Sequence, residues 1–477
     1  MKLTLSEIAP ILGAKCRSPQ KLALGYSIDS RSVKPGELFF AIRGKRWDGH
    51  RFVRQALECG AIGAVIEQKA LGQFQDLTHE ELIPVNDTTA ALQELARAIR
   101  RRWGKKLVGV TGSTGKTTTK EMIAAVLASH FRVLKSPGNL NNQFGIPLSL
   151  LALEPEHEVA VMEMGMSAGG EIARLASIAG PQIGVVTNVA PAHLEFFDSV
   201  DSIARAKREL IEGLQPPKAA ILNFDDDRVR RFAEGFDGRV LTFGFKQGAQ
   251  IRCLEVETFW SKSGQGIRTE FRLEGAPYRG RFTIPMPGRH NVENALAAIA
   301  TAVLFDIPEP EVQNALREFK PPGQRADIIS LPDGLVIMND SYNSNPKAME
   351  MMLKTLRDWP CTGRRIVVAG EMLELGPSSP QLHREVGAIC ARSGIDWLAG
   401  VQGDARYILD GAREAGLSSE RMIYFDRAQE AALFCRGLLR RGDVVLVKGS
   451  RGVHLEELVK ALQPSPENHH DGRERPN

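Results

Sequence analysis

The sequence predicts an α/β protein of three domains, and three observations lead to this prediction. At 477 residues the chain is too long for a single hydrophobic core and corresponds to about three domains. Its composition, with 43% hydrophobic and 25% charged residues, is that of an ordinary globular protein. Short apolar runs of strand length alternate with amphipathic segments along most of the chain, which is typical of parallel sheets covered by helices.

The first domain is predicted at residues 1–104 as a small α/β unit. Its strand candidates are the apolar runs 38–42 and 61–67. A helix is predicted over 90–103, because Leu92, Leu95, Ala96 and Ile99 recur at helical spacing. This helix leads to the predicted boundary.

The second domain is predicted at residues 105–320, with a parallel sheet at its centre. Helical patterns disappear between residues 240 and 287, where alternating strands are expected at 266–273 and 278–284. We therefore expect an antiparallel flap on the same domain, followed by a helix at about 290–304. The parallel strands are predicted at 106–110, 158–163, 183–189 and 219–223.

The third domain is predicted at residues 321–462 as a Rossmann-like unit in which strands and helices again alternate. It lacks a G-x-G-x-x-G motif at its first helix, so dinucleotide binding is not supported there. The polar tail 463–477 is predicted to be disordered, and we assign it no function. The strand candidates are 335–339, 365–369, 396–401, 422–425 and 444–447.

Composition also excludes several classes of protein. The net charge of +4 is small and no basic stripe is interleaved with aromatics, so we expect no nucleic-acid partner. The start lacks the layout of a signal peptide, and no apolar run is long enough to span a membrane. We expect a cytoplasmic monomer whose thiols are reduced. The scattered cysteines form no zinc or disulfide pattern: Cys16, Cys59, Cys253, Cys361, Cys390 and Cys435.

The segment 109–120, GVTGSTGKTTTK, has the pattern of a phosphate-binding loop. It follows an apolar strand and opens a helix, the context that such a loop needs. Two glycines let backbone N–H groups turn toward one anion, Lys116 can reach the terminal phosphates of ATP, and Thr117 offers a hydroxyl to magnesium. The alternative is a glycine turn before a threonine-rich helical turn. The predicted ATP-binding set here is Gly112, Ser113, Thr114, Gly115, Lys116, Thr117 and Thr118.

One departure from the common G-x-x-x-x-G-K-T motif is informative, because Val110 stands where the first glycine is usual. The TGSTGKTT form resembles the Mur ligases, cytoplasmic enzymes that build the peptide of the bacterial wall precursor, and their relative folylpolyglutamate synthase. The resemblance implies an ATP-dependent amide-bond-forming ligase with a central P-loop ATPase domain.

Glu163 ends the apolar run EVAVME, where parallel sheets place ligand-binding side chains. By the resemblance, this carboxylate would share one magnesium ion with Thr117, an oxygen donor set that suits the ion. The alternative is a capping or surface glutamate. His193 follows the next predicted strand within a segment that resembles the family's T-N-x-x-x-x-H-L, which makes it a candidate ligand of a second magnesium. Without the resemblance, a surface histidine would be the simpler interpretation.

Lys207 lies within the apolar stripe of a predicted helix at 199–214. Burying an ammonium costs several kcal/mol unless it is paired or loses its proton. An ion pair would relieve this cost, as would condensation with carbon dioxide to a carbamate that binds magnesium; a lysine that snorkels to solvent is the third alternative. Several Mur ligases carry such a carbamate in a matching A-K-x-E segment. Lys116, Lys207 and His193 are thus the predicted catalytic residues.

Other segments carry the resemblance through the rest of the chain. Asn291, in a G-x-H-N-x-x-N-x-x-A-A motif, would contact adenine, although it could also be a helix cap. Arg325 would approach the phosphates and Asp340 the ribose. Asn345 followed by Pro346 is typical of a helix start. The glycine loops 370–376 and 448–452 follow predicted strands and would line the acceptor side.

The first domain resembles the uridine-diphosphate pocket shared by two members of the family, through Ser30, Arg31, Gly44 and Asp48. The segment 138–147, with Asn142 as a substrate residue, resembles the members that add D-alanyl-D-alanine to UDP-N-acetylmuramoyl tripeptide through an acyl phosphate. The D-N-P-R segment of diaminopimelate-adding members is absent. Two alternatives stay open: a sister ligase that adds one amino acid to the nucleotide dipeptide, and a regulatory P-loop NTPase.

Overall fold

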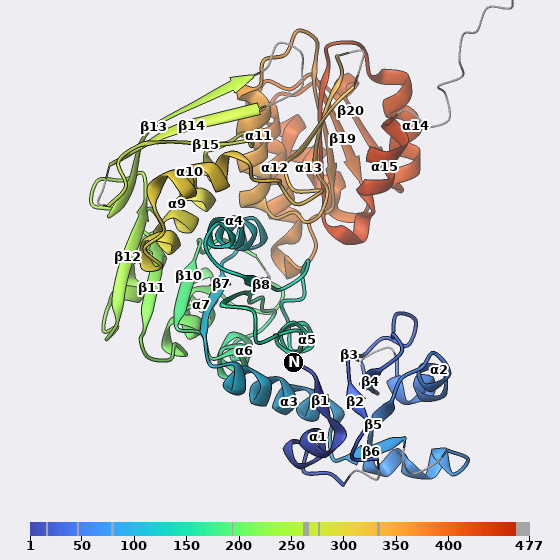
Figure 1. Ribbon diagram of the computed structural model, residues 1–477. Coiled ribbons are helices and arrows are strands. Elements are labelled where there is room, and N and C mark those ends of the chain that lie inside the picture. Colours follow the sequence, from blue (N-terminus) through green and yellow to red (C-terminus); the bar gives the residue numbers. More distant parts are fainter. Residues whose placement is uncertain are drawn as a thin grey trace, which may run out of the picture.

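The computed structural model describes residues 1–15, 18–44, 47–77, 81–192, 194–260, 267–274, 277–331 and 334–463. These residues form three parallel or mixed sheets and one two-stranded ribbon, with helices between the strands (Figure 1). The predicted α/β class is therefore confirmed. The sheets follow one another along the chain in the order that the sequence predicted, while the boundaries at 104 and 320 stay predictions.

The N-terminal sheet contains four parallel strands in the order β3-β4-β5-β6. The runs predicted at 38–42 and 61–67 correspond to β4 and β5, each within two residues at either end. The strands are β3 (Gly25–Ser27), β4 (Glu37–Phe40), β5 (Gly63–Glu67) and β6 (Leu82–Val85). Around them lie the ribbon β1 (Leu3–Thr4) and β2 (Leu22–Ala23) and the helices α1 (Leu5–Ile11) and α2 (Val53–Glu58).

Helix α3 (Thr88–Trp103) joins the N-terminal sheet to the centre of the molecule. Asp87 caps it by accepting hydrogen bonds from the N–H groups of Thr89 (2.7 Å) and Ala90 (2.9 Å). The helix contacts β5 and α1 as well as α5 (Gly145–Leu151) and α6 (Glu171–Ala179) of the central region. Its buried Arg100 donates to the carbonyl oxygen of Ala179 (2.7 Å), at the end of α6.

The central sheet has nine strands in the order β15-β14-β13-β12-β11-β10-β7-β9-β8. Strand β13 pairs in parallel with β12 and antiparallel with β14, so the predicted flap continues the same sheet. The antiparallel strands are β13 (Ile251–Trp260), β14 (Ile267–Glu274) and β15 (Arg281–Ile284); Gly266 lies outside the described residues. The parallel strands are β7 (Lys106–Thr111), β8 (Val133–Lys135), β9 (Val159–Glu163), β10 (Ile183–Val186), β11 (Ala219–Asn223) and β12 (Arg239–Gly244).

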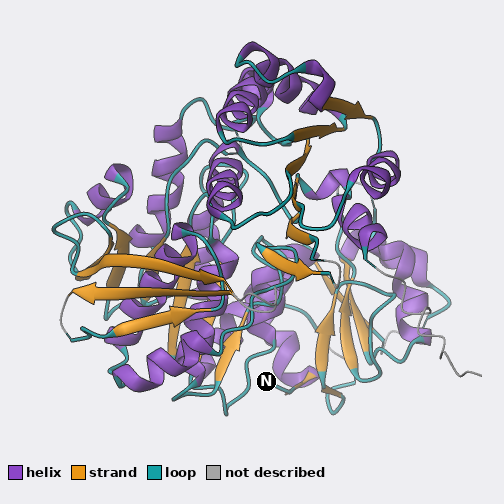
Figure 2. Ribbon diagram, turned by 90° about the horizontal axis from the view of Figure 1, so that it is seen from above, coloured by secondary structure: helices purple, strands orange, loops and turns teal. Residues whose placement is uncertain are grey.

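Helices cover both faces of this sheet (Figures 1 and 2). One face carries α4 (Lys116–Ala128), α9 (Arg289–Leu304) and α10 (Glu309–Arg317), which contact one another. The other face carries α5, α6 and α7 (Val200–Glu212), with the short α8 (Asp227–Arg230) beside α7. The helix predicted at about 290–304 is confirmed as α9.

The C-terminal sheet has six strands in the order β16-β17-β21-β18-β19-β20, and only β16 runs antiparallel. Asn345 accepts from the N–H of Ala348 (2.9 Å), which confirms it as the cap of α11. The strands are β16 (Asp327–Ser330), β17 (Val336–Asp340), β18 (Arg365–Gly370), β19 (Trp397–Val401), β20 (Met422–Phe425) and β21 (Val444–Lys448). The helices are α11 (Pro346–Asp358), α12 (Ser379–Arg392), α13 (Arg406–Glu414), α14 (Ala428–Leu438) and α15 (Leu455–Leu462).

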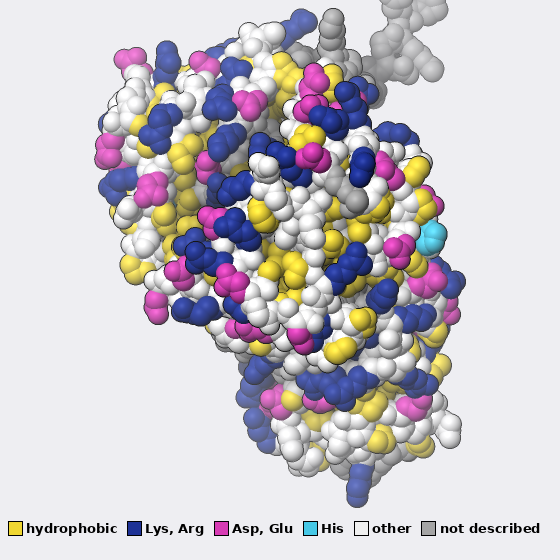
Figure 3. Space-filling view, turned by 90° about the vertical axis from the view of Figure 1, so that its left-hand side faces the viewer, with side chains coloured by type: hydrophobic (Ala, Val, Ile, Leu, Met, Phe, Trp, Pro, Cys, Tyr) yellow, Lys and Arg dark blue, Asp and Glu magenta, His cyan; other side chains and the backbone are white. Residues whose placement is uncertain are grey.

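One apolar core runs from the α4 and α9 face of the central sheet into the C-terminal region. At its edge the rings of Trp260, on the flap, and Trp359, after α11, lie 4.3 Å apart between centroids. Figure 3 shows basic and acidic side chains interspersed over one face of the molecule. Among the described residues, no helix has both the length and the apolar character that crossing a bilayer requires.

Candidate active site

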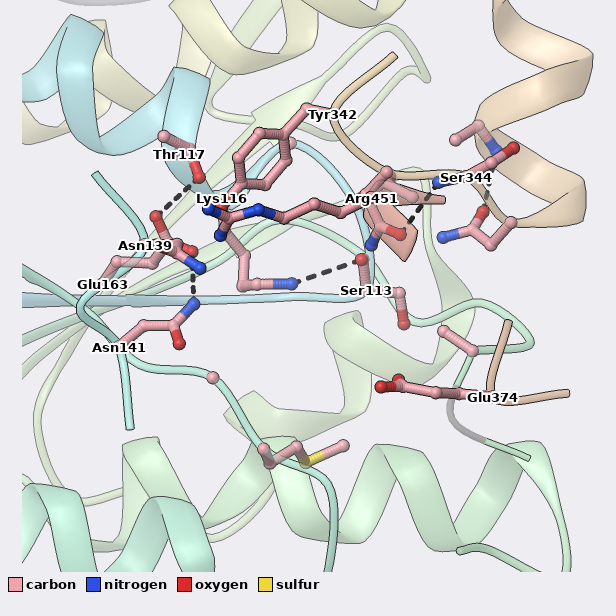
Figure 4. Close-up of a pocket in the computed structure, with 18 of the residues that line it drawn as sticks. Ser113, Lys116, Thr117, Asn139, Asn141, Glu163, Tyr342, Ser344, Glu374 and Arg451 are labelled. Carbon is pink, nitrogen blue, oxygen red and sulfur yellow. Dashed lines mark hydrogen bonds between the residues drawn. The ribbon is translucent and has the colours of Figure 1, made fainter. Parts of the chain in front are cut away.

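A cavity of about 1050 Å³ lies between the central and C-terminal regions. Its central wall is formed by the loop after β7, the segment before α5, the end of β9 and the middle of α7. Its other wall is formed by loops at the carboxyl ends of β17, β18 and β21. Figure 4 shows side chains from both walls directed into this space.

The loop after β7 has a conformation that two glycines make possible. Gly112 has φ +153°, and a Cβ atom there would lie 1.8 Å from the hydroxyl of Thr187. Gly115 has φ +78°, and its Cβ would lie 2.4 Å from the Asn294 side-chain oxygen. Thr187 in turn donates to the carbonyl of Thr114 (2.7 Å). The alternative of an ordinary glycine turn does not explain why both positions lack room for a side chain.

Helix α4 begins at Lys116, so the first-turn N–H groups of Thr117 and Thr118 lie beside the loop, where they can bind an anion. The Lys116 ammonium donates to the carbonyl oxygens of Gly112 (2.8 Å) and Ser113 (3.3 Å) (Figure 4). Burial is the largest cause that lowers the pKa of Lys116. Among the described residues its ammonium forms no ion pair, so the loop presents a cation without a paired carboxylate.

Glu163 lies at the end of β9 and is only 2% exposed. One carboxylate oxygen accepts from the Thr117 hydroxyl (2.7 Å), and the other accepts from the Asn141 amide (2.8 Å) (Figure 4). The alternative of a surface or capping glutamate is therefore wrong. The adjacent oxygens of Thr117 and Glu163 fit Mg²⁺, which prefers oxygen ligands. No group of three or more His, Cys, Asp or Glu among the described residues could hold a metal, so phosphates and water would supply the remaining ligands.

Lys207 is 2% exposed and lines the cavity, as its place in the apolar stripe of α7 predicted. Burial, followed by the nearby charge of Lys116, holds its pKa well below the usual value. Within the described part of the chain its amine has neither a hydrogen bond nor an ion pair, and it does not reach solvent at the surface. An unprotonated amine facing a cavity is the form that condenses with carbon dioxide. His193 lies outside the described residues.

Three side chains at the start of α9 face the same cavity. The amide of Asn291 donates to the carbonyl of Pro287 (2.7 Å). The cap of α9 is Gly288, so the interpretation of Asn291 as a helix cap is wrong. Asn294 accepts from the Thr119 hydroxyl (3.1 Å), which connects α9 to the P-loop helix. Burial lowers the pKa of His290 to about 4, which leaves this ring neutral at pH 7.

Arg325 and Asp340 reach the cavity from the C-terminal region, as predicted. The Arg325 guanidinium lies 4.0 Å from the ring centroid of Tyr342. Asp340 accepts from the N–H of Ala326 (3.1 Å) and forms an ion pair with the buried Lys448 (2.5 Å). Both residues that flank Arg325 adopt left-handed backbone conformations, with φ values of 62° at Gln324 and 51° at Ala326.

The two glycine loops predicted after strands follow β18 and β21 and also line the cavity. They contact each other, because the N–H of Leu373 donates to the hydroxyl of Ser450 (3.0 Å). Beside them, the buried hydroxyl of Ser344 has no hydrogen-bond partner among the described residues. This wall therefore offers a polar group that a ligand could satisfy.

The predicted substrate residues do not all lie together. Ser30 and Arg31 follow β3, while Gly44 and Asp48 follow β4, at one edge of the N-terminal sheet and outside the large cavity. Ser30 donates to Gln55 (2.9 Å), and the exposed Arg31 pairs with Asp29 (2.6 Å). Asp48 pairs with Arg43 and His50, and the N–H of Gly44 donates to Trp47. Asn142, by contrast, lines the large cavity.

Sequence reasoning missed several residues at this site. The side chain of Asn188 accepts from the N–H of Thr114 (3.0 Å) and so supports the P-loop. Arg174 lines both the large cavity and a second cavity of about 470 Å³ between α3 and α6. Its guanidinium has no hydrogen bond or ion pair within the described residues. An arginine on the exposed side of a helix gives no sequence signal that separates it from a solvated one.

Comparisons with known proteins agree along the whole chain. Models of the Mur ligase family match in three parts: the "Mur ligase family, catalytic domain" at residues 24–100, the "Mur ligase middle domain" at 110–302, and the "Mur ligase, glutamate ligase domain" at 324–451. A UDP-N-acetylmuramoyl-tripeptide–D-alanyl-D-alanine ligase of Bacillus subtilis is 35% identical, over 98% of this chain and 99% of its own length. The Escherichia coli ligase of the same name is 33% identical, over 97% and 99%.

Two crystal structures extend this likeness to the fold. MurF from Acinetobacter baumannii superposes with a TM-score of 0.86 at 29% identity, covering 97% of this chain and 99% of its own. MurF ligase from Thermotoga maritima, in complex with ADP, has a TM-score of 0.79 at 28% identity, covering 92% and 97%. The three family models together match well over half of the sequence, and the relatives over 30% identical cover nearly all of it. The chain therefore belongs to the Mur ligase family.

Proposed function

We propose that this protein joins D-alanyl-D-alanine to UDP-N-acetylmuramoyl tripeptide, with ATP converted to ADP and phosphate. The observation that carries the proposal is that relatives bearing this activity in their names match the chain from end to end. The cavity supports it, because a P-loop, a buried carboxylate and a lysine amine with no partner among the described residues face the loops of a second α/β unit. A regulatory NTPase would also need the P-loop and a carboxylate for magnesium, but it would need neither the lysine amine nor the second α/β unit.

ATP would bind with its phosphates against the N–H groups of residues 112–118. The terminal phosphoryl group would then pass in line to the carboxylate that ends the tripeptide, and ADP would leave. Both reactants are anions, so the ammonium of Lys116, which forms no ion pair among the described residues, favours their approach. Asn291 and Asp340 would contact the adenine and ribose, with Arg325 near the phosphates. The cation–π contact with the Tyr342 ring holds the Arg325 guanidinium in a fixed position.

Magnesium would supply further positive charge between the phosphates and the carboxylate. Thr117 and Glu163 are the residues that would hold one ion, since their oxygens adjoin at the cavity. We propose that Lys207, as a carbamate, and His193 hold a second ion. The low pKa and the absence of a partner among the described residues support this assignment for Lys207.

The second half of the reaction would take place toward the C-terminal loops. The amine of D-alanyl-D-alanine would attack the acyl phosphate, form the amide bond, release phosphate and lose a proton. Loops 370–376 and 448–452 would line the acceptor and keep water from the acyl phosphate. The hydroxyl of Ser344, which has no partner in the described ranges, is a hydrogen-bonding group available to this substrate.

The nucleotide end of the tripeptide substrate would bind at the N-terminal sheet, at Ser30, Arg31, Gly44 and Asp48. Arg174 lines both the active-site cavity and the second cavity, which lies between α3 and α6. The second cavity therefore lies between the N-terminal sheet and the active site. A guanidinium that has no partner within the described part of the chain suits an anionic group of an extended substrate. Asn142 would contact the peptide end. We also propose that the protein is a cytoplasmic monomer, and its free thiols suit a reducing compartment.

The test offers the purified protein UDP-N-acetylmuramoyl tripeptide, ATP and magnesium, and measures phosphate release with different acceptors. Release that depends on D-alanyl-D-alanine is expected. Release that depends instead on diaminopimelate or lysine, with the nucleotide dipeptide, would identify the sister ligase. ATP hydrolysis that ignores the UDP-linked peptide would favour a regulatory NTPase. For Lys207, near-normal turnover of a folded Lys207→Ala variant would refute the carbamate.

A further inference from the structure

Lys120 is a buried cation that the proposed reaction does not use. It lies on α4 one turn after Lys116, and its side chain is fully buried. Its ammonium donates to the carbonyl oxygens of Ser136 (2.7 Å) and Gly138 (3.1 Å) and pairs with Glu121 (2.9 Å). Burying a charge is costly, so we expect the interactions of this ammonium to stabilise the structure around it.

The carbonyls that Lys120 holds belong to the segment after β8, which leads directly to Asn141. At its start, the Ser136 hydroxyl accepts from the backbone N–H of Glu163 (3.1 Å). At its end, the Asn141 amide donates to the Glu163 carboxylate (2.8 Å). Both the backbone and the side chain of Glu163 therefore depend on where this segment lies.

The same carboxylate is also held from α4. Its second oxygen accepts from Thr117, which is three residues before Lys120 and so lies on the same side of the helix. Lys120 thus joins the helix that carries Thr117 to the segment that carries Asn141. The carboxylate of Glu163 lies between these two donors (Figure 4).

We propose that Lys120 is a positioning residue that fixes the orientation of the Glu163 carboxylate and thereby sets the affinity of the site for a divalent cation. The inference rests on the proposed function in one respect, namely that a cation binds at Thr117 and Glu163. Groups that orient a metal-binding carboxylate typically change metal affinity about 10- to 100-fold when they are removed.

The chain offers a matched control. Lys135 forms an ion pair with the same Glu121, but its ammonium donates to neither of the two carbonyls. Lys135→Met therefore removes a cation from Glu121 and leaves the segment in place. Lys120→Met removes the donor to both carbonyls, while Glu121 keeps Lys135 as its partner. Ser136→Ala removes the acceptor of the Glu163 N–H without touching any charge.

The experiment measures Mn²⁺ binding by electron paramagnetic resonance, with the full-length protein and a non-hydrolysable ATP analogue. We expect Lys120→Met to weaken Mn²⁺ binding at least about tenfold, Ser136→Ala to weaken it in the same direction, and Lys135→Met to stay within about twofold of the parent. The Mg²⁺ concentration for half-maximal turnover should rise in parallel for the first two variants.

A folded Lys120→Met variant that binds Mn²⁺ as tightly as the parent would overturn the inference. If Lys120→Met does not fold, unchanged Mn²⁺ binding by Ser136→Ala overturns it equally. If the parent protein itself binds no Mn²⁺ with the nucleotide, the proposed cation site fails, and that outcome is distinct from a difference between parent and variant.

Discussion

The two walls of the cavity each have a lysine at or shortly after the end of a parallel strand, but the two lysines have different electrostatic surroundings. Lys116 follows β7 through the P-loop and, among the residues that the structure describes, donates only to backbone carbonyls. Lys448 ends β21 and is paired with Asp340, while also donating to the carbonyl of Asn343 (2.8 Å). The central wall therefore presents a charge that an anionic ligand can neutralise, whereas the C-terminal wall is already neutral at this point. We infer that Lys116 binds an anionic ligand, whereas Lys448 stabilises the fold.

The sharpest test of this difference is Lys116→Met. Removing this cation should lower turnover about 10³-fold. Its positive charge lies where negative charge develops on the phosphates during phosphoryl transfer. Thermal stability should stay close to that of the parent, since no ion pair is broken among the described residues. Steady-state kinetics measure the turnover of the variant, and a thermal melt measures its stability. A large loss of thermal stability together with the loss of turnover would contradict the inference that Lys116 binds a ligand and does not stabilise the fold.

Lys448→Met should have the opposite profile. It leaves Asp340 without its buried partner, so the free energy of unfolding should fall by about 3 kcal/mol in urea titrations. Replacing Asp340 by Asn in the same protein should recover part of the loss, because the uncompensated carboxylate is then gone. A Lys448→Met variant as stable as the parent would show that the ion pair between Lys448 and Asp340 does not stabilise the fold.

His290, close to Asp340 and Lys448, predicts a pH dependence of stability. Burial lowers its pKa to about 4 in the folded protein, against 6.5 for the free side chain, with Asp340 raising and Lys448 lowering the value. Below about pH 6.5 the unfolded chain therefore binds a proton that the folded protein does not, and stability is lost progressively down to about pH 4. Relative to His290→Gln, the parent should lose about 3 kcal/mol across this interval. Parallel stability curves for the two proteins would refute this assignment.

The smallest effect is expected far from both walls. Arg31→Ala should raise KM for the UDP-linked peptide about fivefold and leave KM for ATP unchanged, because Arg31 is exposed and lies outside the cavity. Arg51→Ala, another exposed arginine of the N-terminal region, is the control and should change neither value. Equal effects of both variants would indicate a general loss of positive charge.

Sequence reasoning succeeded where a residue broke an expected pattern. Gly112 and Gly115 stood out by spacing, Glu163 by ending an apolar strand, and Lys207 by interrupting an apolar stripe. The structure places Gly115, Glu163 and Lys207 at one cavity, with Gly112 directly before the lining segment, although their roles stay proposals. Lys120 carried the same signal as Lys207, since it shares a helix face with Ile123 and Leu127, and could have been found in the same way.

The rest required tertiary structure. Asn141 and Asn188 act through partners that are distant in sequence, and asparagines are common in loops. In the fold, β16 escaped notice because its four residues, DIIS, place two apolar side chains in succession between two polar ones, which gives no alternation. The flap was predicted, but its continuity with the parallel sheet depends on the pairing of β12 with β13, which no local pattern encodes.

Helix α3 has a practical consequence for anyone who wishes to divide this chain into smaller proteins. The helix precedes residue 105, yet its apolar side chains belong to one core with those of the N-terminal sheet and of α5 and α6. A fragment that starts at Lys105 would leave the apolar surfaces of α5 and α6 open to water, and a fragment that ends before Thr88 would do the same to the N-terminal sheet. Each half would need its own copy of this helix to remain in solution.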